Sequence, residues 1–163
     1  MNIKIGLLSD THNFFDEKIY NYFKDVDEIW HAGDIGNIEL LNEIKSFKKT
    51  RSVYGNIDDQ EIRNECKKEL LFSLLDFKIF ITHIGGRPPK YNKEVLKKII
   101  NYKPDIFVCG HSHILNISKD EKLNLIYINP GAAGKIGLQK ERTIVRFEIN
   151  IKKKIKSVEV IKL

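Results

Sequence analysis

The stretch IKIGLLSDTH, Ile3–His12, is an apolar run that stops at two residues able to bind a metal, Asp10 and His12. Four other apolar runs, each the length of a short β-strand, end in the same way. Because ligands bind outside the carboxyl ends of the strands in an open α/β sheet, these strand ends predict one shared site. The four runs are Glu28–Trp30 before Gly33 and Asp34, Arg51–Tyr54 before Gly55 and Asn56, Phe77–Ile81 before Thr82 and His83, and Ile106–Cys109 before Gly110, His111, Ser112 and His113.

The order of strand and helix signals predicts an α/β fold. The first half alternates strands with helix-spaced apolar residues, which indicates a parallel sheet, and the part after Cys109 alternates as antiparallel strands do. We expect a four-layer αββα sandwich of two mixed β-sheets flanked by helices, formed by residues 1–163 as a single domain. The expected helices are Phe15–Phe23, Ile38–Phe47 and Glu94–Tyr102, and the expected strands are Ile3–Leu8, Val26–Trp30, Thr50–Tyr54, Leu70–Leu75, Lys78–Thr82, Asp105–Cys109, Ile114–Ser118, Leu123–Ile128, Thr143–Ile149 and Ser157–Leu163.

The composition is that of a soluble globular protein, with 42% hydrophobic and 31% charged residues. The net charge of +6 comes from scattered lysines, which favours a solvated surface over a nucleic-acid patch. Cys66 and Cys109 are too few for a disulfide framework or a cysteine-based metal site. The N-terminal run lacks the features of a signal peptide, and no apolar stretch is long enough to span a bilayer. We therefore expect a cytoplasmic protein that does not bind membranes.

Each strand-end motif is weak by itself, since a Gly-Asp or a Gly-Asn is more often a simple turn. The segment from Gly110 to His113 is more specific, because two histidines two residues apart in one loop can converge on a metal. The common position of all five motifs at strand ends makes coincidence a poor explanation. Four of the five histidines of the chain lie inside these motifs, and the fifth, His31, lies just upstream of Asp34.

Taken in order, Asp10-x-His12, Gly33-Asp34, Gly55-Asn56, His83 and Gly110-His111-x-His113 resemble the motifs of the calcineurin-like metallophosphoesterases. The short length and the segment Asn129-Pro130-Gly131 resemble the small bacterial and archaeal phosphodiesterase branch of that superfamily. The resemblance implies a site with two metals bridged by Asp34. One metal would be held by Asp10, His12 and His113, and the other by Asn56, His83 and His111.

Carboxylate, imidazole and amide ligands without thiolate suit Mn²⁺, Fe²⁺, Ni²⁺ or Zn²⁺, with Mg²⁺ also in range, and the resemblance makes Mn²⁺ the default. Two such metals can share a bridging hydroxide that attacks phosphorus, so no protein nucleophile is needed. We expect a metal-dependent phosphodiesterase that hydrolyses small phosphodiesters and not duplex DNA. Asp34, Asn56 and His83 are the expected catalytic residues, with Asn56 also contacting the substrate.

Four residues outside the ligand set have open roles. Ile57 follows Asn56 where many members of the family carry a proton-donating histidine, so the general acid is unnamed. His31 could orient a metal-bound carboxylate or be a hydrogen-bonded residue of the strand end. Asp58 could support the site or simply form a turn or helix cap. Arg87, after Gly85-Gly86, could bind a phosphate or be a solvated loop residue.

Two functions other than a phosphodiesterase stay open. One is a catalytically weak or inactive scaffold of this fold that acts through protein contacts. The other is a nucleotide phosphomonoesterase or a nuclease. The residues do not decide the oligomeric state, and a homo-oligomer is left open.

Overall fold

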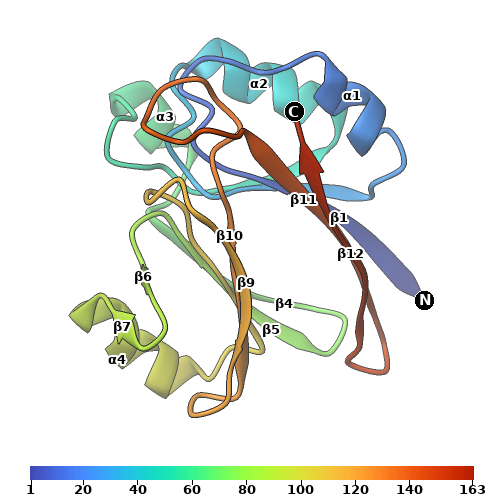
Figure 1. Cartoon of the computed structure of the whole chain (residues 1–163), viewed down its shortest axis with the longest axis vertical. Helices are drawn as coiled ribbons and strands as arrows, with labels where there is room; N and C mark the ends of the chain where they lie inside the picture. Colours follow the sequence, from blue (N-terminus) through green and yellow to red (C-terminus); the bar gives the residue numbers. More distant parts are fainter.

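The computed structural model describes residues 1–163 and consists of two β-sheets packed face to face with helices outside them (Figure 1). The first sheet has the strand order β12-β11-β1-β2-β3 and the second the order β4-β5-β8-β10-β9. Both sheets are mixed, since parallel pairs such as β1–β2 and β5–β8 lie beside antiparallel pairs such as β1–β11 and β4–β5. The expected αββα architecture is therefore confirmed.

The bounds of the elements are as follows. The helices are α1 (Lys18–Phe23), α2 (Ile38–Phe47), α3 (Gln60–Glu65) and α4 (Lys93–Tyr102). The strands are β1 (Asn2–Leu8), β2 (Glu28–His31), β3 (Lys49–Ser52), β4 (Glu69–Leu74), β5 (Phe77–Thr82), β6 (Gly86–Arg87), β7 (Lys90–Tyr91), β8 (Ile106–Val108), β9 (Leu115–Asp120), β10 (Leu125–Pro130), β11 (Thr143–Asn150) and β12 (Ile155–Lys162). None of the helices combines the length and the apolar character needed to cross a bilayer.

Three apolar clusters hold the layers together. The central cluster joins the inner faces of the sheets, with Leu7 and Trp30 from the first sheet against Ile81 and Val108 from the second. A second cluster packs α1 and α2 on the outer face of the first sheet, and a third packs α4 on the outer face of the second. Figure 1 shows this division, with α1, α2 and α3 on one side of the sandwich and α4 on the other.

Most expected elements differ from the structure by one to three residues at an end, and two of these differences have a local cause. The helix expected over Phe15–Phe23 begins only at Lys18, and the Asp16 side chain accepts a hydrogen bond from the Lys18 backbone N–H in the turn that precedes it. Phe15 still packs against the second apolar cluster. The strand expected over Thr50–Tyr54 ends at Ser52, because Val53 pairs instead with Lys67 in an isolated bridge.

Candidate metal centre

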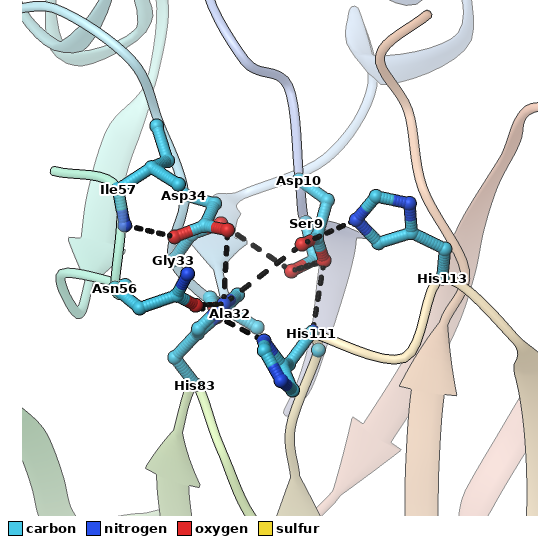
Figure 2. A network of polar contacts seen from close by, with 12 residues as sticks. Ser9, Asp10, Ala32, Gly33, Asp34, Asn56, Ile57, His83, His111 and His113 are labelled. Carbon is cyan, nitrogen blue, oxygen red and sulfur yellow. Dashed lines mark hydrogen bonds and ion pairs between the residues drawn. The ribbon is translucent and has the colours of Figure 1, made fainter. Parts of the chain in front are cut away.

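The five strand-end motifs meet at one edge of the sandwich (Figure 2). Backbone hydrogen bonds join neighbouring loops within each sheet, Asp10 N–H to Gly33 O at 2.9 Å in the first and Gly110 N–H to His83 O at 3.0 Å in the second. A third bond links the sheets directly, since the His111 N–H donates to Asp10 Oδ2 at 3.1 Å. The site is therefore built from both halves of the fold.

Most of the expected ligands have an unusual backbone conformation. Left-handed φ angles between 44° and 66° occur at five of them, Asp10, His12, Asp34, His111 and His113. Non-glycine residues rarely adopt this region, and such strain gathers at functional sites where the surrounding structure enforces it. The sharp reversals after the strands turn these side chains toward one another.

Two groups of ligand atoms result. Asp10, His12 and His113 form one group and Asp34, His83 and His111 the other, and within each group the ligand atoms lie within 4.8 Å of one another. Asn56 belongs beside the second group, because its Oδ1 is 3.0 Å from His83 Nε2 and 3.0 Å from His111 Nδ1.

Asp34 faces both groups. Its Oδ2 is 3.2 Å from His83 Nε2 in the second group and 3.4 Å from His12 Nε2 in the first. Its other oxygen, Oδ1, accepts the backbone N–H of Ile57 at 3.0 Å, which fixes the carboxylate between the groups. This is the place that a bridging ligand would need.

The donor atoms fit divalent cations. Asp10 Oδ1 and His12 Nε2 are buried and make no hydrogen bond, although His113 Nε2 approaches Asp10 Oδ1 to 3.0 Å. Buried polar atoms without a partner are costly and uncommon, so these two atoms indicate a missing partner of positive charge. Carboxylate, imidazole and amide donors without thiolate are the set that Mn²⁺, Fe²⁺, Ni²⁺ and Zn²⁺ accept.

The electrostatics agree with that role. Burial acts to raise the pKa of Asp10, but the imidazoles of His113 and His12 outweigh it and hold the pKa well below its usual range. Burial likewise acts to raise the pKa of Asp34, and His83 outweighs it and lowers the pKa. Both carboxyl groups are therefore ionised at neutral pH and ready to bind cations.

Comparison with known proteins adds the family. Residues 3–152 match the family described as the calcineurin-like phosphoesterase superfamily domain. The chain belongs to this superfamily. A probable metallophosphoesterase of Methanocaldococcus jannaschii is 30% identical over 136 residues, which cover 78% of this chain and 67% of that protein. A probable metallophosphoesterase of Methanothermobacter thermautotrophicus is 28% identical over 134 residues, 78% of this chain and 76% of that protein.

Two solved structures share the whole fold of this chain. A structure described as a novel archaeal phosphodiesterase superposes with a TM-score of 0.77 at 25% identity, covering 99% of this chain and 100% of the other. Wild-type Vps29 of Entamoeba histolytica, described as complexed with zinc, superposes with a TM-score of 0.74 at 16% identity, covering 98% and 99%. The second similarity shows the fold alone.

His31, the one histidine outside the motifs of this phosphoesterase, supports the loops of the site and touches none of the ligand side chains. Its Nδ1 accepts the Gly33 N–H at 3.1 Å, and its Nε2 lies 3.0 Å from Thr11 Oγ1. The Thr11 hydroxyl donates to Ile35 O at 2.8 Å, so the histidine must be the donor to Thr11. His31 is thus a hydrogen-bonded neutral side chain of the strand end.

Asp58 ties together the loops that carry Asp34 and Asn56. Its Oδ2 accepts the N–H groups of Gly55 at 2.8 Å and Ile35 at 3.2 Å, and its Oδ1 accepts that of Gly36 at 2.9 Å. The cap of α3 is instead the next residue, Asp59. Asp58 therefore holds these two loops together and does not cap the helix.

Arg87 and Ile57 make no side-chain contact with the ligands. Arg87 lies exposed in the short β6–β7 hairpin and forms no ion pair or side-chain hydrogen bond, so its guanidinium is free for either of the two roles expected for it. Ile57 is exposed and contributes only its backbone N–H, to Asp34. The position after Asn56 therefore holds no proton donor in this phosphoesterase.

Three contacts that sequence reasoning missed orient the ligands. The Ser9 hydroxyl donates to Asp10 Oδ2 at 2.6 Å, which leaves Oδ1 free. The ring Nδ1 of His83 lies 2.7 Å from Ala32 O, and that of His113 lies 2.8 Å from Gln139 Oε1. Donation through Nδ1 leaves the Nε2 lone pair of each ring available to a cation. Ser9 adjoins a motif residue, but nothing in the sequence pattern distinguishes Gln139.

Proposed function

We propose that the protein is a phosphodiesterase that uses two divalent cations, with Mn²⁺ as the default, to hydrolyse small phosphodiesters. The position of Asp34 Oδ2, 3.2 Å from His83 Nε2 and 3.4 Å from His12 Nε2, is the observation that carries the proposal. One carboxylate facing two ligand groups suits a pair of cations. Bound there, the cations would supply the Lewis acidity that activates water and polarises a phosphoryl group. The similarity to an archaeal phosphodiesterase supports the choice of diesters.

The protein groups divide the work in this proposal. Asp10, His12 and His113 would hold one cation, and Asn56, His83 and His111 the other, with Asp34 between them. The Asn56 Oδ1 faces both histidines of its group, so its amide N–H₂ remains free to donate to a phosphoryl oxygen. No serine, cysteine or threonine hydroxyl or thiol of the ligand loops is needed as a nucleophile.

Because Ile57 cannot donate a proton, we expect the rate of hydrolysis to depend strongly on the leaving group. General acid catalysis contributes about 10²–10⁴-fold, and this contribution matters most for poor leaving groups. We expect p-nitrophenyl diesters to be hydrolysed at least about 100-fold faster than alkyl diesters. Plotting kcat against the pKa of the leaving alcohol measures this dependence, and a flat plot would show that a proton donor has been overlooked.

A panel of metals and substrates tests the proposal. Purified protein is assayed with Mn²⁺, Ni²⁺, Mg²⁺ and Zn²⁺ on bis(p-nitrophenyl) phosphate and on p-nitrophenyl phosphate, with Asp34→Asn as the inactive variant. Asp76→Asn, the same change at an exposed turn, is the matched control. We expect diester hydrolysis by wild type and by the control, fastest with Mn²⁺. Equal rates for wild type and Asp34→Asn would refute the proposal, and a preference for the monoester would favour a phosphomonoesterase.

Metal analysis separates the enzyme from a scaffold of the same fold. A scaffold can lose its ligands without losing its fold, whereas all seven ligand positions here carry a competent side chain, gathered at one edge of the sandwich. We therefore expect about two cations per chain by elemental analysis after reconstitution. Protein that keeps no cation and hydrolyses no ester would be a scaffold.

We also infer a cytoplasmic location. Cys66 and Cys109 are both free and buried. Burial raises the pKa of the Cys66 thiol, and it raises the pKa of the Cys109 thiol to about 12. Reduced, unreactive thiols suit a reducing compartment. Fractionation of cells with an antibody against the protein tests this inference.

A further inference from the structure

A cavity of about 500 Å³ opens beside the second ligand group. Asn56 and His83 form part of its wall, so a molecule bound at the metal centre could extend into it without a break. Its volume lies within the range of about 300–1,000 Å³ that small-molecule sites occupy. The rest of the wall includes Tyr54, Arg63, Lys68, Ile84, Asn92 and Lys98.

The cavity has an excess of unpaired positive charge. Two carboxylates line it, but Glu69 is paired with Lys98, and Glu94 with Lys97 at 3.0 Å. Arg63 and Lys68 also line it, and neither forms an ion pair with a carboxylate of the chain. Two cationic side chains in a mainly polar cavity would attract an anionic group.

Arg63 is held in place by three contacts at the mouth of the cavity. Its Nε donates to Asp58 O at 2.7 Å, its Nη2 lies 3.5 Å from Asn56 O, and its Cζ stands 4.8 Å above the centre of the Tyr54 ring. The bonds to Asp58 O and Asn56 O use one N–H of Nε and one of Nη2, which leaves the N–H groups of Nη1 free for an oxyanion. A guanidinium fixed in this way loses little side-chain freedom when it binds a ligand.

We propose that this cavity is the subsite for an ester substituent of the substrate, and that Arg63 and Lys68 select phosphodiesters whose substituent carries a further anionic group. The inference rests on the proposed phosphodiesterase function and names its substrate class. The phosphodiester would lie at the metal centre, with the substituent passing Asn56 and His83 into the cavity. Its anionic end would meet the two free cations.

Two esters that differ only in charge test the subsite. p-Nitrophenyl p-carboxyphenyl phosphate and p-nitrophenyl p-carbamoylphenyl phosphate share a leaving group and nearly the same shape. For wild type we expect a KM about three- to tenfold lower for the carboxylate ester, the size expected of one or two partly exposed ion pairs. This preference should shrink as salt is added, because exposed charges are screened.

Variants identify the residues. In Arg63→Gln and in Lys68→Gln the two KM values should converge, whereas Lys122→Gln, which removes an equal charge from the exposed turn between β9 and β10, should keep the wild-type ratio. Lys68 makes no hydrogen bond to the rest of the chain, so its variant tests the subsite even if Arg63→Gln disturbs the fold. Titration calorimetry of both esters with Asp34→Asn should show the same ratio of Kd values without turnover.

The outcomes separate the subsite from the function. If wild type hydrolyses both esters with equal KM, or if both variants keep the preference, the subsite is wrong while the phosphodiesterase proposal stands. If wild type hydrolyses neither ester faster than Asp34→Asn, both proposals are wrong. A preference lost in both variants and kept in Lys122→Gln supports the subsite.

Discussion

His31 is neutral in the folded protein because of its burial and its hydrogen bonds. It is fully buried, and its Nδ1 serves as the acceptor for the Gly33 N–H. Burial lowers the pKa of His31 to about 3, since a proton on the ring would be both desolvated and in conflict with that hydrogen bond. In the unfolded chain the pKa returns to about 6.5.

The pH dependence of stability follows from this difference. Between pH 6.5 and 3 only the unfolded state binds a proton at His31, so its contribution to stability is complete above pH 6.5 and declines as the pH falls. We expect His31→Gln to be less stable than wild type by about 1–3 kcal/mol at pH 7. This difference in stability between wild type and His31→Gln should shrink by about 1.4 kcal/mol for each pH unit below 6.5.

Urea unfolding of the metal-free proteins at pH 7, 6 and 5 measures that gap. Lys156→Gln, an exposed change in β12, should differ from wild type by the same amount at every pH. A gap between wild type and His31→Gln that stays constant from pH 7 to pH 5 would mean that His31 titrates normally in the folded protein.

Among single residues, the proposed ligands are easier to predict from the sequence than the residues that orient them by hydrogen bonds. Asp10 and His83 stand out because each follows an apolar run and has a side chain suited to cations. Gln139 carries no such signal, since it is 26 residues from His113 in an irregular loop. The Gln139 amide reaches the His113 ring only in the folded chain.

Among the elements, the loops after β2 and β3 depend on one carboxylate. Asp58 accepts three backbone N–H groups, one from its own loop and two from the loop that carries Asp34. Asp58→Asn would turn one oxygen into an N–H₂ group that faces these donors. We expect a loss of about 2 kcal/mol of stability and a weaker second cation site, because Asn56 and Asp34 would no longer be held together.

The neighbouring residue provides a matched control. Asp59→Asn makes the same change at the N-cap of α3, where Asn and Asp are about equally good, so its stability should change by only a few tenths of a kcal/mol. Thermal unfolding and titration calorimetry with Mn²⁺ compare the two variants. Equal effects in both would show that Asp58 has no special role in the site.

Long elements were predicted well and short ones poorly. The helix α2 has apolar residues on one face and a side-chain cap, Asn37, and it lies where the pattern placed it. The six-residue helix α3 was missed, because Ile62 is its only buried residue and a single apolar position has no period. Its existence depends on the Asp59 cap and on packing against the second apolar cluster.

For the whole molecule, the candidate metal centre lies where loops of the two sheets meet. Asp10 and Asp34 follow strands of the first sheet, and His83 and His111 follow strands of the second. The loops approach so closely that a Cβ on Gly110 would lie 2.1 Å from Ser9 Oγ, and one on Gly55 would lie 2.0 Å from Asp34 Oδ1. Cations bound there would therefore stabilise the sandwich as a unit.

Removal of metal should lower the stability of the whole protein. At a free metal concentration 100 times the Kd, binding adds about 2.7 kcal/mol, which corresponds to several degrees in Tm for a chain of this size. We expect excess chelator to lower the Tm of reconstituted wild type, and Mn²⁺ to restore it. Asp34→Asn should respond much less. A Tm that chelation leaves unchanged would contradict a metal site formed by both sheets.

The architecture and the residue types proposed as ligands could be predicted from the chain alone, because strand periodicity and the residues that end each strand are local properties of the sequence. The division of the proposed ligands into two groups was implied by the family resemblance alone, and the folded chain gathers the same residues, because loops from two sheets meet around Asp34. The hydrogen-bond partners of His31, Asp58 and Gln139 likewise come from other segments of the chain, and the sequence pattern does not predict them. A buried strand can be predicted because its apolar residues form a regular pattern in the sequence. A hydrogen bond between distant segments produces no such pattern.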